Sequence, residues 1–311
     1  MKTMGRRQRS RGRDVHGVLV FDKPEGLPSR QAVNRVNDIV HAKKIGHTGS
    51  LDPLATGVLP LVLGNATKFS QYLLNADKEY KVKVLLGVST DSGDADGQVI
   101  AERCTESLSR EKIEKALSAY RGKIWQTPPM FSALKHQGQP LYKLARKGIE
   151  VERNAREQII FKNELVDFEG TELHLDLHCS KGTYVRTLVH DLGEDLGCGA
   201  HVIALRRTKA GPFGSDQLVT LEQLQDAQAN KSIDKLLMPV ESTISHWPAV
   251  EVNKVAAFHV RQGQTIAVAH SLEKGWVGLF EENSSEPQSR QFIGVGEVLE
   301  DGTIAPKRLI T

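Results

Sequence analysis

The stretch from Gly46 to Pro60, GHTGSLDPLATGVLP, places one carboxylate, Asp52, among glycines, prolines and other small or apolar residues. Its three glycines permit close backbone approach and unusual backbone torsions, and Pro53 biases Asp52 away from helix, so the segment is predicted to form a shaped turn. A carboxylate held rigidly in such a turn can attack or accept a proton with little loss of conformational freedom. The alternative is that Asp52 only hydrogen-bonds its own turn, as in many Asp-Pro sequences.

Two further residues have side chains suited to chemistry. Arg186 lies in SKGTYVRT, at the predicted start of a helix, where the helix dipole disfavours a cation unless an anion compensates it. A carboxylate or a phosphate would compensate the charge; the alternative is an arginine exposed to solvent. Tyr80 begins the EYKVKVLL segment and is either a core aromatic or a ring that stacks on a planar substrate.

Several familiar signatures are absent from the sequence. It contains no phosphate loop, no G-x-G-x-x-G between strand and helix, and no G-x-S-x-G nucleophile elbow. The SGDADG segment resembles the start of a calcium loop, but Ser92 replaces the first acid and Arg103 the final glutamate. His41 and His47 do not have the spacing of a metal-binding pair. These absences argue against ATP binding, dinucleotide binding, serine-hydrolase chemistry and a calcium site.

The elements that must position these residues can be predicted from periodicity. Strands are expected in GVLVFDKP, GVLPLVLG, EYKVKVLLGV, TELHLDLHCSKG and HVIALRRTKAGPF, and helices in SREKIEKALSAYRG and YVRTLVHDLGEDLG. Ser29 is expected to cap a further helix that follows it. Strands and helices do not alternate regularly, which favours an α+β fold with a mainly antiparallel sheet over a doubly wound one.

Length and composition indicate two domains in an ordinary globular chain. The 311 residues exceed what one core usually fills. We expect a catalytic domain over 14–248, with an insertion at about 128–156, and a small barrel-like domain over 250–311. Three widely spaced cysteines suit a reducing compartment, and neither a signal peptide nor an apolar run long enough to span a membrane is evident, so a cytoplasmic location is expected.

Positive charge is concentrated in two places. Residues 1–13 carry six of the bases and form a basic arm, which we expect to be disordered, while the remainder is close to neutral. The segment 133–156 carries six Lys and Arg against two Glu. By contrast, residues 250–311 hold six bases and eight acids. An anionic partner would therefore be bound locally, by the arm or by the insertion.

The motif around Asp52, together with FDKPEG, KEYKV, FSALKHQGQPLYKLARKGIEV, SKGTYVRTLVHDLG and CGAHVIALRR, resembles the TruB family of tRNA pseudouridine-55 synthases. The resemblance runs through nearly the whole chain from about Asp14. It implies a pseudouridine synthase fold with a mainly antiparallel mixed sheet, a thumb-like insertion and a C-terminal PUA domain. It also implies the isomerisation of a T-loop uridine of tRNA to pseudouridine, without a metal or an organic cofactor, after the base has been flipped out.

The resemblance also implies roles for individual residues. Asp52 matches the catalytic aspartate, Arg186 its ion-pair partner, and Tyr80 the ring that stacks on the target base and is a candidate for accepting the carbon 5 proton. His47 matches the residue that holds the loop once the uridine has left its stack. The remaining matches are to substrate-pocket positions: Lys23, Tyr184 and Leu205.

Two other activities are compatible with parts of this pattern. A non-catalytic RNA-binding or RNA-remodelling protein would need the basic insertion and Tyr80 but not Asp52. A hydrolase of the nucleoside glycosidic bond would use Asp52 but release free uracil. The intact motif together with Arg186 favours the isomerase acting on the T-arm and T-loop of tRNA, and a monomer is expected because no exposed pairing helix is evident.

Overall fold

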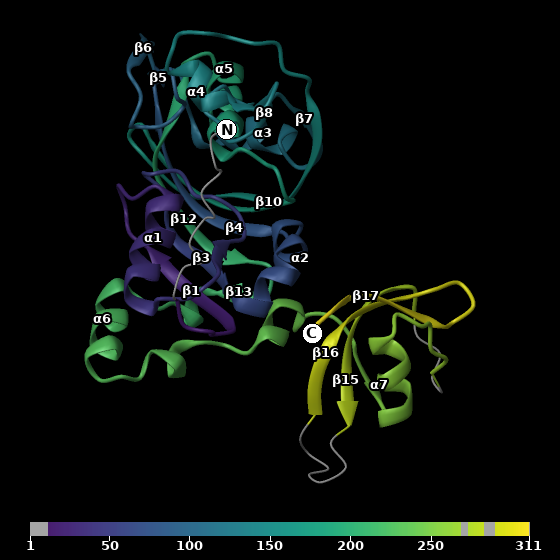
Figure 1. Ribbon diagram of the computed structural model, residues 1–311. Helices are drawn as coiled ribbons and strands as arrows, with labels where there is room; N and C mark the ends of the chain where they lie inside the picture. Colours follow the sequence, from purple (N-terminus) through teal and green to yellow (C-terminus); the bar gives the residue numbers. More distant parts are fainter. Residues whose placement is uncertain (1–11, 269–272, 283–289, 311) are drawn as a thin grey trace, which may run out of the picture.

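The computed structural model describes residues 12–268, 273–282 and 290–310, and its largest element is a nine-stranded mixed sheet (Figure 1). Seven strands follow the order β1-β3-β12-β4-β11-β10-β7, with β2 paired to β3 and β13 to β12. The pairing of β12 with β3 is parallel, and the other pairings in this sheet are antiparallel. The expected α+β fold with a mainly antiparallel sheet is therefore confirmed. The strands are β1 (Gly17–Lys23), β2 (Ile45–His47), β3 (Thr56–Leu63), β4 (Lys78–Leu86), β7 (Gly122–Gln126), β10 (Arg156–Glu169), β11 (Glu172–Cys179), β12 (Ala200–Ala210) and β13 (Phe213–Gly214).

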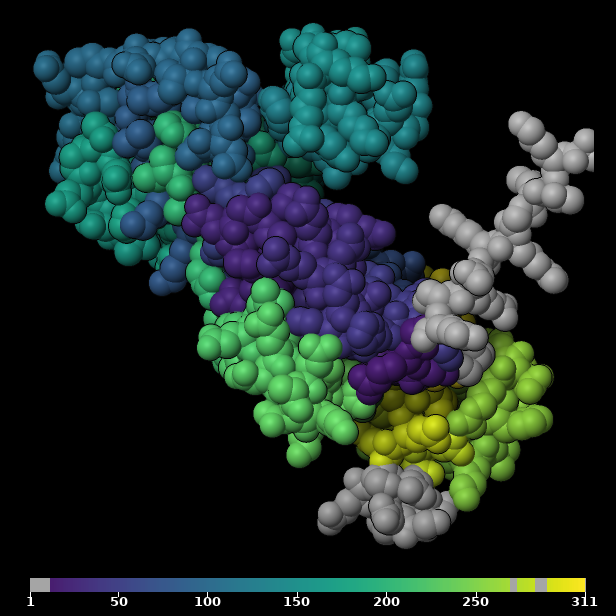
Figure 2. All heavy atoms as spheres, turned by 60° about the vertical axis from the view of Figure 1, so that its left-hand side comes forward, coloured from purple at the N-terminus to yellow at the C-terminus, as the bar shows by residue number. Residues whose placement is uncertain are grey.

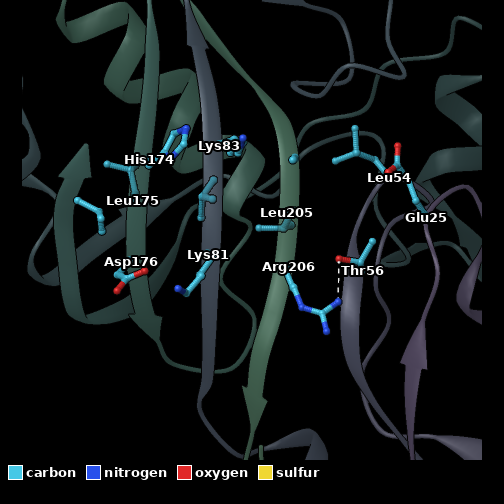
Figure 3. Close-up of a pocket in the computed structure, with 13 residues that line it drawn as sticks. Glu25, Leu54, Thr56, Lys81, Lys83, His174, Leu175, Asp176, Leu205 and Arg206 are labelled. Carbon is cyan, nitrogen blue, oxygen red and sulfur yellow. Dashed lines mark hydrogen bonds between the residues drawn. The ribbon is translucent and has the colours of Figure 1, made fainter. Parts of the chain in front are cut away.

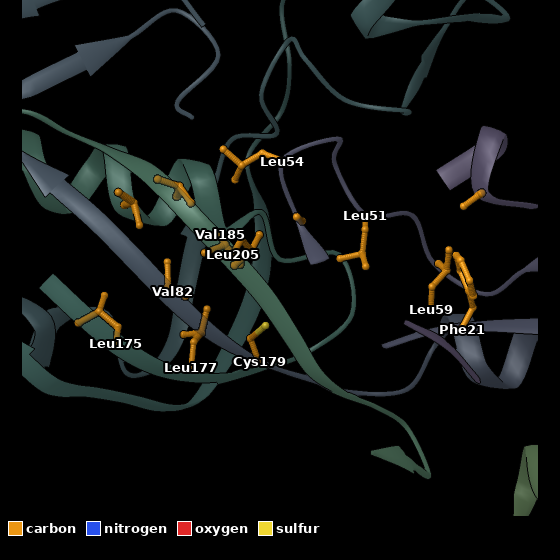
Figure 4. Packing of buried hydrophobic residues seen from close by; sticks show 14 of the residues in the cluster. Phe21, Leu51, Leu54, Leu59, Val82, Leu175, Leu177, Cys179, Val185 and Leu205 are labelled. Carbon is orange, nitrogen blue, oxygen red and sulfur yellow. The ribbon is translucent and has the colours of Figure 1, made fainter. Parts of the chain in front are cut away.

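Helices cover the sheet and bury the main core against it. Apolar residues spaced three and four apart give α1, α3, α5 and α6 one buried face each. Figure 4 shows part of this core, where Val82 of β4, Leu175 of β11 and Leu205 of β12 lie near one another. Leu51 and Leu54, on either side of Asp52, belong to the same core, so the motif is anchored by its apolar neighbours. The helices are α1 (Ser29–Val40), α2 (Ser70–Leu74), α3 (Arg110–Ala119), α4 (Leu141–Ala145), α5 (Val185–Asp195), α6 (Leu221–Ala229) and α7 (Lys254–Arg261).

One of two expected serine caps differs from the structure. Ser29 is the first residue of α1 and does not cap it, since its hydroxyl is bonded to the backbone of Leu51 instead. Ser109 does cap α3 by accepting from the Lys112 amide, as the sequence indicated. The Ser29 interaction is between distant segments, which a local pattern cannot reveal.

A compact insertion lies between β7 and β10. It contains a small hairpin of β8 (Lys135–His136) and β9 (Gln139–Pro140), followed by α4. The Arg153 guanidinium closes its base by donating to the carbonyl oxygens of Pro128 and Val151, each at 3.1 Å. Figure 2 shows this segment in teal as a lobe that stands apart from the rest of the molecule.

The C-terminal part forms a separate four-stranded sheet in the order β14-β15-β16-β17, with α7 packed on it. A small barrel-like domain was expected over 250–311; the described residues show these four strands, and Ile266 forms a further antiparallel bridge with Ile304 of β17. Rings of Phe69 and Tyr72 pack against Phe292, Trp247 and Trp276, and join this sheet to the catalytic body. Its strands are β14 (Ala249–Val252), β15 (Gly275–Glu282), β16 (Arg290–Val298) and β17 (Ile304–Leu309).

The remaining segments complete the description. β5 (Val88–Thr90) and β6 (Val99–Glu102) form a hairpin above the main sheet (Figure 1). Residues 1–11 of the predicted basic arm lie outside the described residues, and Arg13, its last residue, forms a 2.6 Å ion pair with Asp234. Within the described ranges, no helix is long and apolar enough to cross a membrane.

Candidate active site

The loop that carries Asp52 connects β2 to β3 and is fixed by several bonds to its backbone. The Ser29 hydroxyl accepts from the Leu51 amide at 2.7 Å and donates to the Leu51 carbonyl at 2.8 Å. The buried Lys23 ammonium donates to the Pro53 carbonyl at 3.0 Å. These contacts hold the two residues that flank Asp52, so the carboxylate is positioned before any substrate binds.

Backbone conformation explains two of the three glycines in the motif, and close packing adds to the requirement at one of them. Gly49 and Gly57 have φ values of 117° and 95°, which other residues rarely adopt. Gly57 also lies directly against the backbone of Arg207, and a Cβ there would be 2.3 Å from its carbonyl oxygen. Gly46 needs neither freedom, because its φ is not positive and a Cβ on it would meet nothing within 4 Å.

Asp52 and Arg186 form an ion pair. The Arg186 Nε lies 2.8 Å from Asp52 Oδ2, and the arginine side chain is only 6% exposed while that of Asp52 is 40% exposed. The same guanidinium donates to the carbonyl oxygens of Ser92 at 2.8 Å and Phe131 at 2.7 Å. Its contacts therefore fix the arginine on the protein side and leave one side of the carboxylate open to a substrate.

A second carboxylate, Asp94, faces the same arginine. Its Oδ2 lies 3.4 Å from Arg186 Nη1, and its side chain is 5% exposed. Burial raises the pKa of Asp52 above its ordinary value, Arg186 opposes this rise, and the negative charge of Asp94 adds to it. The positive charge of Arg186 thus offsets part of the cost of holding two carboxylates together.

Tyr80 lies in the middle of the sheet, beside a buried arginine. It pairs with Leu177 of β11 on one side and Arg207 of β12 on the other. Burial raises the pKa of Tyr80, and the positive charge of Arg207 opposes that shift. The phenol is therefore neutral at physiological pH and can present an uncharged ring and a hydroxyl.

Three buried cations, Arg207, Lys23 and Lys78, lie in this region, and the first two bond to the loop that carries Asp52. Arg207, which is 1% exposed, donates from Nε to the Val58 carbonyl at 2.6 Å and from Nη2 to the Gly49 carbonyl at 3.2 Å. Burial lowers the pKa of Lys23 and of Lys78 to about 8 in each case, with Asp52 opposing the shift at Lys23. Backbone carbonyl oxygens accept hydrogen bonds from these buried cations and so offset part of the cost of burying their charge.

The remaining predicted residues are His47, Tyr184 and Leu205. Burial lowers the pKa of His47, whose Nδ1 has no hydrogen-bond partner within the described part of the chain, so its ring is neutral at physiological pH. Tyr184 precedes the first residue of α5, two positions before Arg186. Leu205 is 7% exposed and packs in the main core.

A cavity of about 280 Å³ lies over strands β3, β4, β11 and β12 (Figure 3). Its lining includes Leu54 and Leu205 together with the cations Lys81, Lys83 and Arg206. Of the residues predicted from the sequence, only Leu205 lines it, because Asp52, Tyr80 and Arg186 belong to the separate cluster described above.

Family models match the chain in three consecutive blocks. Residues 37–185 match the N-terminal domain of the TruB family pseudouridylate synthases, 186–245 the tRNA pseudouridylate synthase B C-terminal domain, and 248–310 the C-terminal part of pseudouridine synthase II TruB. The chain is 52% identical to a tRNA pseudouridine synthase B of Coxiella burnetii, with 96% of each chain covered. The chain belongs to the TruB family of pseudouridylate synthases. A TruB relative of Pseudomonas aeruginosa is 50% identical over 96% of this chain and 97% of its own.

Solved structures agree with this membership. A chain in the structure of an H/ACA RNP bound to a substrate RNA containing 2′-deoxyuridine superposes with a TM-score of 0.71 at 25% identity, over 95% of this chain and 85% of its own. The main sheet with its helices therefore has the pseudouridine synthase fold. Together with the curated TruB relatives, this identifies the chain as a tRNA pseudouridine synthase, an isomerase that acts on RNA.

Two residues of the cluster were missed by sequence reasoning. Asp94 lies in the SGDADG segment, which had been considered only as a calcium loop. Arg207 lies within β12, in a strand whose alternation predicts burial without predicting a buried charge. A usable signal for Arg207 was its placement at an inward-facing position of β12, where an arginine requires several acceptors.

Proposed function

We propose that the chain isomerises uridine 55 in the T-loop of tRNA, with Asp52 as the catalytic aspartate. The observation that carries this proposal is the 2.8 Å contact between Asp52 Oδ2 and Arg186 Nε, on a loop whose backbone is fixed on both sides of the acid. A half-exposed carboxylate paired to a buried arginine is available to a substrate and remains ionised when RNA encloses it.

The reaction breaks the bond between sugar carbon 1′ and base N1 and forms a bond from the same carbon to base carbon 5. Carbon 5 loses a proton and N1 gains one, so the composition of the nucleotide does not change. Attack of Asp52 on the sugar, attack on the base, and removal of the carbon 2′ proton all require the carboxylate anion. Arg186 favours that anion in each case, because its positive charge lowers the pKa of Asp52.

We assign Tyr80 and His47 to the step in which the target uridine is flipped out of the tRNA loop. A uridine inside a folded loop must leave its stack before its glycosidic bond can be reached, which costs a few kcal/mol. Stacking on the neutral Tyr80 ring offsets part of that cost. Tyr80 is also a candidate for accepting the carbon 5 proton, a step that requires its phenolate, and the positive charge of Arg207 favours that anion. We assign the neutral His47 ring to holding the tRNA loop after the uridine has left its stack.

The remaining predicted residues are assigned to the substrate pocket. Lys23 holds the Asp52 loop through the Pro53 carbonyl, and it opposes the rise in the pKa of Asp52. Tyr184 begins the helix that carries Arg186, and Leu205 supplies an apolar surface next to Val82 in the main core.

We assign RNA binding outside the pocket to the insertion and the C-terminal sheet. The insertion over 128–156 carries a cluster of Lys and Arg that suits the phosphates of the T-arm. Residues 250–311 are proposed to form a PUA-like domain, distinct from the catalytic domain over 14–248. We further propose that the protein acts as a monomer in the cytoplasm, which is compatible with its three unpaired cysteines.

The test compares the protein with its Asp52→Asn variant on unmodified tRNA. Pseudouridine at position 55, free uracil and tRNA affinity are measured in parallel. Loss of pseudouridine with retained affinity supports the catalytic role of Asp52. Equal product from both proteins overturns it. Free uracil in place of pseudouridine would indicate hydrolysis, and binding without product from either protein would indicate an RNA-remodelling function.

A further inference from the structure

Gln126 is a buried glutamine at the end of β7, where the chain leaves the sheet to enter the insertion. Its side chain is only 2% exposed and contacts the backbone of Tyr184, which is distant in the sequence. The Gln126 Oε1 accepts from the Tyr184 amide at 2.7 Å, and its Nε2 donates to the Tyr184 carbonyl at 3.0 Å. One amide group therefore satisfies both backbone groups of a single residue.

Tyr184 occupies a sensitive position in the fold. It is the N-cap residue of α5, and no side chain caps that helix. Its carbonyl also accepts the first helical bond, from the Leu188 amide at 3.1 Å. Fixing both groups of Tyr184 therefore fixes where α5 begins and how its first turn is oriented. Arg186 lies in that first turn, so the position of its guanidinium follows from the position of Tyr184.

A second contact joins the same two segments. The carbonyl oxygen of Phe131, five residues beyond Gln126, accepts from Arg186 Nη2 at 2.7 Å. The stretch from Gln126 to Phe131 thus holds the start of α5 at two points, the backbone of Tyr184 and the side chain of Arg186. The guanidinium needs such support because it contacts two carboxylates, Asp52 and Asp94, and also donates to backbone carbonyl oxygens such as that of Ser92. All of these contacts require one orientation of the side chain.

We propose that Gln126 is a positioning residue for the reaction: it clamps the Tyr184 backbone and thereby aims Arg186 at Asp52. This inference rests on the roles assigned to Asp52 and Arg186 above. Gln126 is also the last residue of β7 before the basic insertion. The clamp therefore links the start of the insertion to the ion pair between Asp52 and Arg186. The role predicts an effect on the rate of the chemical step and not on the affinity for tRNA.

The chain offers a matched control in Gln158. This glutamine lies on the adjacent strand β10 and is 8% exposed, so it is buried to a similar degree. Its Oε1 accepts from the Ser180 hydroxyl at 3.3 Å, whereas the two side-chain bonds to the Tyr184 backbone come from Gln126. Gln158→Leu therefore removes a buried amide from the same region without releasing the start of α5.

The experiment measures single-turnover pseudouridine formation and tRNA affinity for Gln126→Leu, Gln126→Glu and Gln158→Leu. We expect Gln126→Leu to be about 10- to 100-fold slower with tRNA affinity within about twofold of the parent chain, and Gln158→Leu to be near the parent rate. Gln126→Glu keeps an acceptor for the Tyr184 amide but turns a carboxylate oxygen toward the Tyr184 carbonyl, so a rate below that of the parent chain is expected. Thermal unfolding of each variant identifies one that does not fold, and Gln126→Glu then carries the test.

A double-mutant cycle separates positioning from general stability. The Gln126 substitution is repeated in an Arg186→Lys background, which has no guanidinium for Gln126 to position. Little further loss there supports the proposal, because the two residues act through one contact. An equal fold-loss in both backgrounds overturns it, as does lost tRNA affinity with an unchanged rate. A normal rate for Arg186→Lys alone would instead remove the role proposed for Arg186.

Discussion

Asp94 Oδ2 lies 3.4 Å from Arg186 Nη1, and both side chains are nearly inaccessible to solvent. The guanidinium therefore serves a buried carboxylate and, through its Nε, the half-exposed Asp52 at the same time. Losing one partner of such a buried pair leaves an uncompensated charge, which is strongly destabilising. The acidity of Asp52 depends on this shared arrangement as well as on its own loop.

The Asp94→Asn variant tests that dependence through pH. The negative charge of Asp94 raises the pKa of Asp52, so its removal lowers that pKa. Because the reaction needs the Asp52 anion, activity falls as pH drops through that pKa. We expect the acid limb of the single-turnover rate to move to lower pH in the variant, while the plateau rate falls about tenfold because Arg186 loses an anchor. An acid limb that stays in place or moves to higher pH would contradict the coupling.

Replacement of Tyr80 separates stacking from proton transfer. Tyr80→Phe keeps the ring and removes the hydroxyl, so a phenolate that accepts the carbon 5 proton predicts a rate at least about 100-fold lower with tRNA affinity unchanged. Tyr80→Leu also removes the ring, and tRNA binding should then weaken by about 1 to 3 kcal/mol. Both quantities come from single-turnover and filter-binding measurements. A Phe variant with full activity would exclude the hydroxyl from the chemistry.

The Gly57→Ala variant tests the packing that shapes the loop. A Cβ at Gly57 would lie 2.3 Å from the Arg207 carbonyl oxygen, on a residue with φ of 95°. We expect the free energy of unfolding to fall by about 3 kcal/mol, since both strain and a backbone clash are introduced. Urea unfolding measures the loss.

Gly26→Ala is the matched control for Gly57. Its φ is 74°, also left-handed, but a Cβ there meets nothing within 4 Å. Only the conformational strain remains, so a loss of about 1 kcal/mol is expected. Equal losses at the two glycines would show that the contact with Arg207 contributes nothing.

The sequence and the structure agree where a pattern is local. Alternation in EYKVKVLLGV and TELHLDLHCSKG predicted β4 and β11, and the helical stripe after Tyr184 predicted α5, because one buried face imposes a fixed period. The pairing of Asp52 with Arg186 was expected only from family resemblance, and spacing alone left it open. Asp94 and Gln126 act through contacts between segments far apart in sequence, which no local period encodes.

The buried Lys78 gives a final prediction, on stability instead of rate. Its ammonium donates to the carbonyl oxygens of Leu74 and Ala76, and burial lowers its pKa from 10.5 to about 8. Between those values the unfolded chain holds a proton that the folded chain has released, so the stability of the folded state rises as pH increases from 8 to 10.5. In Lys78→Met this contribution, at most about 3 kcal/mol, should disappear.

Chemical unfolding at several pH values across that window measures the slope. Lys23 has a similarly lowered pKa, so the Lys78→Met chain should keep part of the rise and lose the rest. Lys115→Met, which replaces an exposed lysine on α3, should leave the slope of the parent chain unchanged. If Lys78→Met kept the full slope, Lys78 would have to remain protonated in the fold, and the carbonyls of Leu74 and Ala76 would then be enough to stabilise a buried charge beside Arg207.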